Sequence, residues 1–172
     1  MQTIILGGGC FWCTESVFLA VKGVQSVTSG YAGGSADTAT YKAVCTGQTD
    51  HAEVIKVEFD ESVITLDTIL NIFFTIHDPT TPNRQGNDVG RQYRSVIFYT
   101  DENQKPIIEK TINNLRDMGI NVVTEVAPAP KFFMAEDYHQ DYFNKNPTQG
   151  YCQFAIPPKL AKLRQNFADY LN

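Results

Sequence analysis

The sequence has few cysteines, no long apolar run and no excess of positive charge. Only four of its 172 residues are cysteine, which is too few for a small disulfide-stapled scaffold. No stretch approaches the roughly 18 consecutive apolar residues needed to span a bilayer. A formal net charge of −5 disfavours nucleic acid or an anionic membrane as a partner. The sequence therefore predicts a soluble globular protein with no nucleic-acid and no membrane partner.

The N-terminus also lacks the features of a secretory signal, since it has no charged segment and only Ile4-Ile5-Leu6 before a run of glycines. We therefore expect a cytoplasmic protein, in a reducing compartment where cysteine is more often catalytic or metal-binding than structural. A length of 172 residues with 42% hydrophobic content suggests one domain with a full core. We expect a monomer whose single domain comprises a core over residues 1–146 and a C-terminal tail and closing helix over 147–172.

What the sequence does contain is a glycine run that leads into a cysteine, Gly7-Gly8-Gly9-Cys10, followed by Phe11-Trp12-Cys13. The apolar run Thr3–Leu6 precedes it and apolar residues at helical spacing follow, which predicts a strand, a tight turn and a helix beginning beside Cys10. Free backbone N–H groups and the helix dipole favour an anion there, and the thiolate is the nucleophilic form of cysteine. We therefore expect the Cys10 thiol to ionise readily; the alternative is a buried structural cysteine among core aromatics.

The remaining periodicity predicts one α+β unit. The expected strands are Thr3–Leu6, Val24–Tyr31, His51–Phe59, Arg94–Tyr99 and Val122–Val126, and the expected helices are Trp12–Val21, residues 66–74 with Thr65 as N-cap, Glu102–Met118, Glu136–Asn144 and Pro158–Tyr170. Up to the fourth strand the order is β-α-β-β-α-β, the split β-α-β arrangement of the ferredoxin-like class. The extra C-terminal strand and helices follow, with a coil tail over Pro147–Pro158.

Two groups of polar residues are predicted on loops or at strand ends, where scaffolds commonly carry function. One group precedes the third strand and the other precedes the fourth, and together they contain Tyr41, Cys45, His51, Glu53, Asp88, Arg91 and Tyr93. Each also has an ordinary structural explanation, such as an exposed strand-edge carboxylate for Glu53, turn chemistry for Asp88 and packing for the tyrosines. We expect Cys45 to be a small buried hydrophobic residue.

Four segments of the chain resemble the A-type peptide methionine sulfoxide reductases. They are Gly9-Cys10-Phe11-Trp12 with Thr14-Glu15, Tyr41-x-x-Val44-Cys45-x-Gly47-x-Thr49-x-His51-Ala52-Glu53, Asp88-Val89-Gly90-x-Gln92-Tyr93-Arg94-Ser95, and Ala135-Glu136-Asp137-x-His139-Gln140. The resemblance implies reduction of the S-epimer of methionine sulfoxide, free or in oxidised proteins, to methionine. It further implies thioredoxin or a similar dithiol as reductant, and no metal or organic cofactor.

The family's site residues can be carried over by position. Sulfoxide sulfur is electrophilic, but its oxygen leaves poorly unless protonated, so the reaction needs a thiol nucleophile and an acid. A carboxyl group serves as that acid near pH 7 only if its surroundings keep it neutral. The resemblance assigns the nucleophile to Cys10, the acid to Glu53, oxygen binding to Tyr41 and Tyr93, the wall around the S-methyl group to Phe11 and Trp12, and ordering of the site to Asp88.

The resemblance offers two thiols to resolve the sulfenic acid on Cys10, because Cys13 stands where most of the family has glycine. Cys13 is close in sequence, but helical i, i+3 geometry does not aim two sulfurs at one another. Cys152 lies in the expected coil tail and could reach the site. We expect Cys152 to act first, with Cys13 as the alternative and a relay from a Cys10–Cys152 bridge to Cys13 as the third arrangement.

Three other function classes remain open from the residues alone. Cys10-x-x-Cys13 could belong to a thioredoxin-like dithiol oxidoreductase, although only one strand precedes it. A structural zinc site could use Cys10, Cys13, Cys45 and His51, although the spacing of the second pair is unusual. Finally, the chain could be a module that binds oxidised methionine without reducing it.

Overall fold

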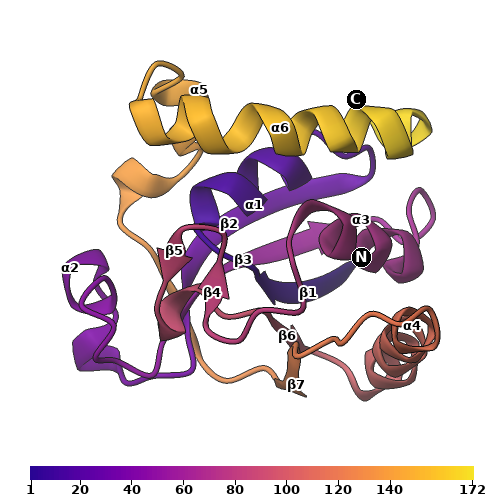
Figure 1. Ribbon diagram of the computed structural model, residues 1–172, viewed down its shortest axis with the longest axis horizontal. Helices are drawn as coiled ribbons and strands as arrows, with labels where there is room; N and C mark the ends of the chain where they lie inside the picture. The colour runs from indigo at the N-terminus through magenta and orange to yellow at the C-terminus, as the bar shows by residue number, and fades with distance from the viewer.

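The computed structural model covers residues 1–172 and is organised around a six-stranded sheet with the order β7-β6-β1-β3-β2-β8 (Figure 1). The strands are β1 (Gln2–Gly7), β2 (Val24–Ala32), β3 (Ala52–Phe59), β6 (Val96–Tyr99), β7 (Glu125–Pro128) and β8 (Phe132–Met134). All neighbours are antiparallel except β6 and β7. With α1 (Phe11–Leu19) after β1 and α3 (Leu66–Ile76) after β3, strands β6-β1-β3-β2 have the predicted ferredoxin-like order. The α+β prediction is confirmed.

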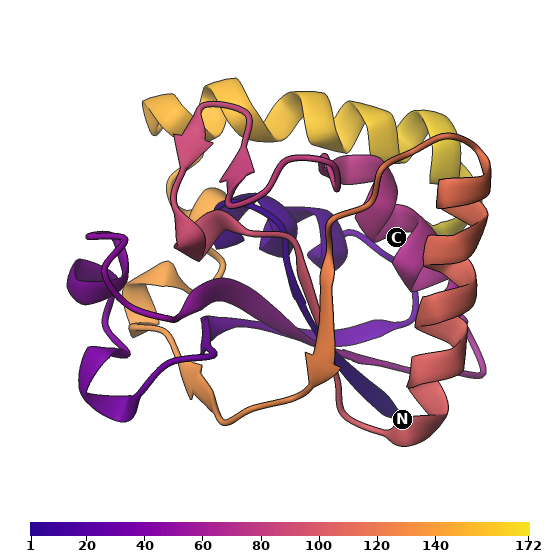
Figure 2. The same ribbon diagram turned by 60° about the horizontal axis from the view of Figure 1, so that its bottom comes forward.

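Helices cover one face of the sheet. Together with α1 and α3, the helices α4 (Lys105–Asp117) and α6 (Gly150–Phe167) enclose a core of 30 buried residues. In Figure 1, α6 lies along the top of the molecule directly above α1. The opposite face has a cluster of only six buried residues, and Figure 2 shows the chain crossing it between β7 at one edge and β8 at the other. None of the helices combines the length and apolarity needed to cross a membrane.

The predicted amphipathic patterns correspond to these layers. In β3, Ile55 and Val57 belong to the large core and Val54 to the small cluster, as alternation along a strand requires. Helix α3 begins as expected, since the Thr65 hydroxyl accepts a hydrogen bond from the Thr68 N–H at 3.2 Å. The local sequence therefore determines the central strands and α3 almost to the residue.

Short elements occupy segments that were predicted to be loops. They are α2 (Tyr41–Val44), β4 (Arg84–Gln85), β5 (Asp88–Val89), and the 3-10 turns η1 (Ala36–Thr38) and η2 (Arg91–Tyr93). Four further short elements fall in segments predicted as helices, namely η3 (Glu102–Gln104), η4 (Asp137–His139), α5 (Tyr142–Lys145) and η5 (Ala168–Tyr170). Strands β4 and β5 pair as an antiparallel hairpin. This β4–β5 hairpin (residues 84–89) forms one side of the site described below.

Two predicted elements are displaced or divided. The fifth strand begins at Glu125 rather than Val122, because pairing with β6 starts where Val96 faces Glu125, while Val122 is buried before the strand begins. The helix predicted over Glu136–Asn144 is divided into η4 and α5. The Gln140 side chain hydrogen-bonds the backbone of Ser29 in β2, and Asp141 has a positive φ of 53°. Tertiary contacts thus override the helical pattern.

The coil tail predicted over Pro147–Pro158 is wrong. Residues Gly150–Phe167 form one continuous helix that contains Pro157 and Pro158. Proline favours a first helical turn and disrupts a helix interior, which is why the sequence placed a helix start at Pro158. The observed helix starts earlier because Cys152, Ile156 and Leu163 are buried in the core, and Gln149 caps it by accepting a hydrogen bond from the Cys152 N–H at 2.8 Å.

Candidate active site

The turn between β1 and α1 places Cys10 at the start of the helix. Gly9 has a φ of +88°, which favours glycine, and a Cβ added at Gly8 would lie 2.9 Å from the His77 ring. Cys10 is the N-cap residue of α1 and only 7% exposed. The predicted strand, turn and helix are therefore present, and the glycines allow the backbone to pass close to neighbouring side chains.

The expectation that Cys10 ionises readily is wrong for this structure. Burial raises the pKa of the Cys10 thiol well above its ordinary value, and contact with Cys13 and the nearby Glu53 carboxyl raise it further. A helix N-terminus stabilises an anion by a fraction of a kcal/mol to about 2 kcal/mol, which is less than the desolvation of a buried charge. Without substrate, Cys10 is therefore a thiol.

Glu53 of β3 is the second buried group at this turn, with an exposure of 1%. Its Oε1 accepts a hydrogen bond from the Phe11 N–H of α1 at 3.1 Å, while Oε2 has no hydrogen-bond partner. Burial raises the pKa of the carboxyl to about 8, despite the opposing effect of the Phe11 N–H. Glu53 is therefore not an exposed strand-edge carboxylate but a buried, neutral acid with a free oxygen at neutral pH.

Aromatic rings surround the same turn. Trp12 stacks on Tyr142 with ring centroids 4.0 Å apart, and its indole N–H donates to Nδ1 of His139 at 3.0 Å. The ring of Tyr41 lies 6.3 Å from that of Phe11 and 6.0 Å from that of Trp12. The side chains that would form the methyl wall are therefore held in place by neighbours from α2, η4 and α5.

Tyr41 and Tyr93 are both half-buried beside this aromatic group. Burial is the main cause that raises the pKa of each phenol, and the nearby Glu53 carboxyl adds to it. Tyr93 is also tied to the cysteine turn, since its carbonyl accepts a hydrogen bond from the Gly9 N–H at 3.2 Å. Glu136 holds Tyr41 by accepting from its backbone N–H at 3.0 Å. Both hydroxyls therefore keep their protons at neutral pH.

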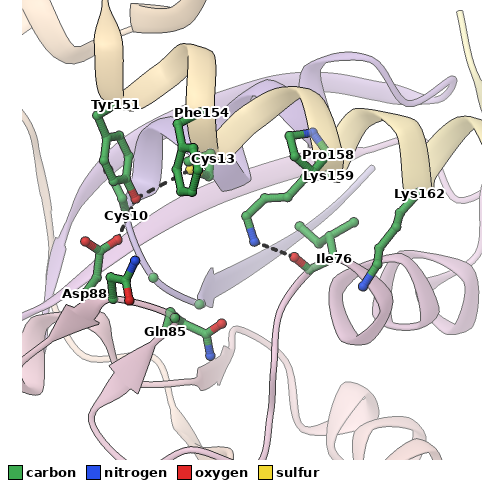
Figure 3. Close-up of a pocket in the computed structure, with 15 residues that line it drawn as sticks. Cys10, Cys13, Ile76, Gln85, Asp88, Tyr151, Phe154, Pro158, Lys159 and Lys162 are labelled. Atoms are coloured by element: carbon green, nitrogen blue, oxygen red, sulfur yellow. Dashed lines mark hydrogen bonds between the residues drawn. The ribbon is translucent and has the colours of Figure 1, made fainter.

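A groove of about 530 Å³ opens beside the cysteines, between α6 and the β4–β5 hairpin (Figure 3). Its walls come from the cysteine turn, the end of α3, the hairpin and α6. The lining residues are Gly8, Gly9, Cys10, Cys13, Ile76, Gln85, Gly86, Asn87, Asp88, Tyr151, Phe154, Ala155, Pro158, Lys159 and Lys162. Of the nine predicted site residues, only Cys10, Cys13 and Asp88 line it.

Tyr151 connects Asp88 with Cys13 at one end of the groove. Its hydroxyl donates to Oδ2 of Asp88 and lies 3.9 Å from Sγ of Cys13. Lys159 lies further along α6 and donates to the Ile76 carbonyl at 2.7 Å (Figure 3). Sequence reasoning missed both residues. Tyr151 could have been noticed because it precedes Cys152 in the sequence. Its contact with Asp88, however, depends on helix α6, which was predicted to be coil.

The four cysteines lie in different environments. Cys13 is 2% exposed and close to Cys10, which lowers the pKa of the Cys13 thiol through a hydrogen bond. Cys152 is fully buried in the main core and does not line the groove, and burial raises the pKa of its thiol to about 11. Cys45 is exposed, so its predicted burial is wrong; it ends the short helix α2 on the protein surface.

The zinc-site alternative finds no geometric support. His51 uses one ring nitrogen to accept from the Gly34 N–H at 3.1 Å and contacts the Ser35 carbonyl with the other at 2.8 Å. No three His, Cys, Asp or Glu side chains are grouped to hold a metal ion. His51 is therefore structural, as is His139, which holds Trp12.

Comparisons with known proteins agree with this arrangement. The family model described as peptide methionine sulfoxide reductase matches residues 2–171. The peptide methionine sulfoxide reductase MsrA of Psychrobacter cryohalolentis is 73% identical over 171 residues, covering 99% of each chain.

Two solved structures of one yeast protein also match the chain. Mxr1 from Saccharomyces cerevisiae in reduced form matches with a TM-score of 0.79 and 36% identity, covering 91% of this chain and 89% of that chain. Mxr1 in complex with Trx2 matches with a TM-score of 0.55 and 26% identity, covering 82% and 84%. This chain is therefore an oxidoreductase that reduces methionine sulfoxide, and it belongs to the peptide methionine sulfoxide reductase family.

Proposed function

We propose that Cys10 and Glu53 together reduce the S-epimer of methionine sulfoxide, free or in oxidised proteins. The observation that supports this proposal is a buried carboxyl group with a pKa of about 8 and an unpartnered oxygen, beside a thiol at a helix N-terminus. A neutral carboxyl in that position can give its proton to a bound sulfoxide oxygen. The choice of epimer follows from the A-type resemblance.

In the reduction step, Cys10 Sγ attacks the sulfoxide sulfur while Glu53 protonates the oxygen. Protonation makes the substrate cationic, and a cation beside Cys10 favours the thiolate that the empty site disfavours. As the bond between Cys10 Sγ and the substrate sulfur forms, the sulfur–oxygen bond breaks and the oxygen leaves as water with the protons of Glu53 and the Cys10 thiol. Water then attacks Cys10 Sγ and displaces methionine, the released proton returns to Glu53, and Cys10 is left as a sulfenic acid. The sulfoxide gains the two electrons that the Cys10 sulfur loses.

The surrounding residues position the substrate for this step. Tyr41 and Tyr93, as neutral donors, would hold the sulfoxide oxygen while its charge changes. Phe11 and Trp12 would surround the S-methyl group. Asp88 acts indirectly, since its contact with the Tyr151 hydroxyl fixes the position of that ring beside Cys13.

We propose that Cys13 is the first thiol to resolve the sulfenic acid and that Cys152 does not act before it. Cys13 lines the same groove as Cys10, and the pKa of its thiol is lowered. Cys152 faces the core from a capped helix, so the first turn of α6 would have to unwind before its thiol could leave the core. Attack of Cys13 on the Cys10 sulfur forms a disulfide and releases water.

The disulfide would be reduced by thioredoxin or a similar dithiol protein. The match to the complex of Mxr1 with Trx2 supports this choice. Thiol–disulfide exchange through a mixed disulfide returns both cysteines to thiols and requires no metal or organic cofactor. A monomeric state and a cytoplasmic location remain predictions from the sequence.

The test of the proposed function is turnover of racemic methionine sulfoxide with dithiothreitol, resolved by epimer. We expect the S-epimer to be converted to methionine and the R-epimer to remain. Cys10→Ser should convert neither epimer, because no nucleophile is left. Loss of the R-epimer alone, or turnover by Cys10→Ser, would contradict the proposal.

A further inference from the structure

We propose that the groove between α6 and the β4–β5 hairpin is the docking site for a dithiol protein of the thioredoxin type, which reaches Cys13 through it. The inference rests on the proposed Cys10–Cys13 disulfide and adds the location of the reductant. It is carried by the position of the two sulfurs, the charges of the groove and the apolar side chains at its mouth.

The groove is lined by other residues than those proposed to bind the sulfoxide, although Trp12 contacts its wall at Tyr151 with ring centroids 6.2 Å apart. Both Cys10 and Cys13 line it, whereas Glu53, Tyr41, Tyr93, Phe11 and Trp12 do not. A disulfide between the two cysteines would therefore face the acid and the aromatic rings on one side and the groove on the other. A protein thiol can approach Cys13 through the groove without passing the sulfoxide-binding residues.

The walls of the groove suit thiol–disulfide exchange at Cys13. Lys159 and Lys162 give one wall positive charge, which attracts the attacking thiolate. The Tyr151 hydroxyl, which donates its proton to Asp88, lies 3.9 Å from Cys13 Sγ and forms the polar edge of the groove beside that sulfur.

The exchange balances as two displacements. The incoming thiolate bonds to Cys13 Sγ, the Cys10–Cys13 bond breaks, and the Cys10 thiolate leaves and takes the proton held by Glu53. The partner's second thiol then attacks its own bonded sulfur and releases Cys13 as a thiolate. The dithiol becomes a disulfide, and its two electrons reduce the enzyme.

The mouth of the groove carries exposed apolar side chains. Phe154 of α6 is 75% exposed, and Val89, next to the groove-lining Asp88 in the hairpin, is 70% exposed. In Figure 3, Phe154 and Tyr151 both descend from α6 toward the cysteines. Aromatic side chains beside a pocket are typical anchors in protein interfaces, so a folded partner that presents its thiol on an apolar turn fits better than a small charged thiol.

The test compares substitutions in the groove with matched substitutions on the same helix. Phe154→Asp and Lys162→Glu alter the mouth and the positive wall, while Gln153→Asp and Arg164→Glu alter exposed residues that do not line the groove. We expect the KM for thioredoxin to rise about tenfold or more in the first pair, the scale of an interface anchor, and to stay within twofold in the second. Methionine release in a single turnover, which involves no reductant, is the internal control.

Several results would overturn the inference. They are a parental KM for thioredoxin in both groove variants, equal effects in the control variants, or an increase in the KM for a sulfoxide peptide instead. Peptide mapping that finds only a Cys10–Cys152 disulfide would also overturn it, because Cys13 would not be the target. Failure of the parent to release methionine in a single turnover would instead contradict the proposed function.

Discussion

At the scale of single residues, the site is organised around a proton rather than a preformed thiolate. Burial raises the pKa of both Cys10 and Glu53, so both groups are protonated at neutral pH in the empty site. A sulfoxide needs both a nucleophile and an acid, and a neutral carboxyl beside a thiol can supply the proton when the substrate arrives. The reactive state therefore forms on substrate binding.

This arrangement predicts the effect of Glu53→Gln on the reduction step. Glutamine can accept the Phe11 N–H bond that Glu53 accepts now, but it cannot release a proton. We expect methionine release in a single turnover to fall roughly 10²-fold or more, the usual scale for loss of general acid catalysis. The parent rate should decline as pH rises through about 8, the pKa of Glu53, and the variant should lack that decline.

The matched control is Glu58→Gln, on the same strand but only half-buried and opposite Thr3, at the end of β1 away from the cysteine turn. It should keep both the parent rate and the parent pH profile. A Glu53→Gln variant that reduces sulfoxide at the parent rate would mean that the proton comes from another group.

At the scale of elements, the N-termini of α1 and α6 determine which thiols can meet. Helix α1 carries Cys13 in its first turn, next to Cys10 at the N-cap. Helix α6 presents Tyr151 to the groove and the adjacent Cys152 to the core. Consecutive helical residues point about 100° apart, which is why Tyr151 lines the groove while Cys152 is buried in the core.

We therefore predict that Cys152→Ser forms a Cys10–Cys13 disulfide at close to the parent rate after one equivalent of sulfoxide. Cys13→Ser should accumulate the sulfenic acid on Cys10 or form a Cys10–Cys152 bridge at least tenfold more slowly, because the capped first turn of α6 must unwind. Rapid quenching followed by peptide mapping measures both species. A Cys10–Cys152 bridge as the first disulfide in the parent would restore the order expected from the sequence.

At the scale of the whole molecule, the burial of Glu53 lowers the stability of the native state at neutral pH. The carboxyl lies between the sheet and α1 with an exposure of 1%, and its pKa rises from 4.5 to about 8. Between those values the native state retains a proton that the unfolded chain has lost. The contribution of the Glu53 carboxyl to the free energy of unfolding therefore falls as pH rises from 4.5 to about 8.

Glu53→Gln should for this reason stabilise the protein at neutral pH. We expect the free energy of unfolding at pH 7 to increase by about 3 kcal/mol, since each pKa unit corresponds to about 1.4 kcal/mol. The gain should disappear below the ordinary pKa of 4.5, where both states of the parent are protonated. Urea unfolding at pH 4 and pH 7 measures it, and an equal gain at both values would point to packing instead.

The sequence alone determined much of this protein. Strand alternation and amphipathic helices have local periods, so the central strands, α1 and α3 could be located from the order of residues. The glycines before Cys10 likewise predict a turn from backbone conformation alone. The four motifs identified the family and its candidate residues.

Only the tertiary structure decided how those residues behave. Cys152 lies in a helix because Ile156 and Leu163 of the same helix are buried in the core. The local preferences of Pro157 and Pro158 do not predict that packing. The Cys10 thiol is neutral because surrounding chain segments exclude water, an effect that exceeds the helix dipole. Burial depends on the sum of contacts made by distant segments, and such contacts are absent from any local pattern in the sequence.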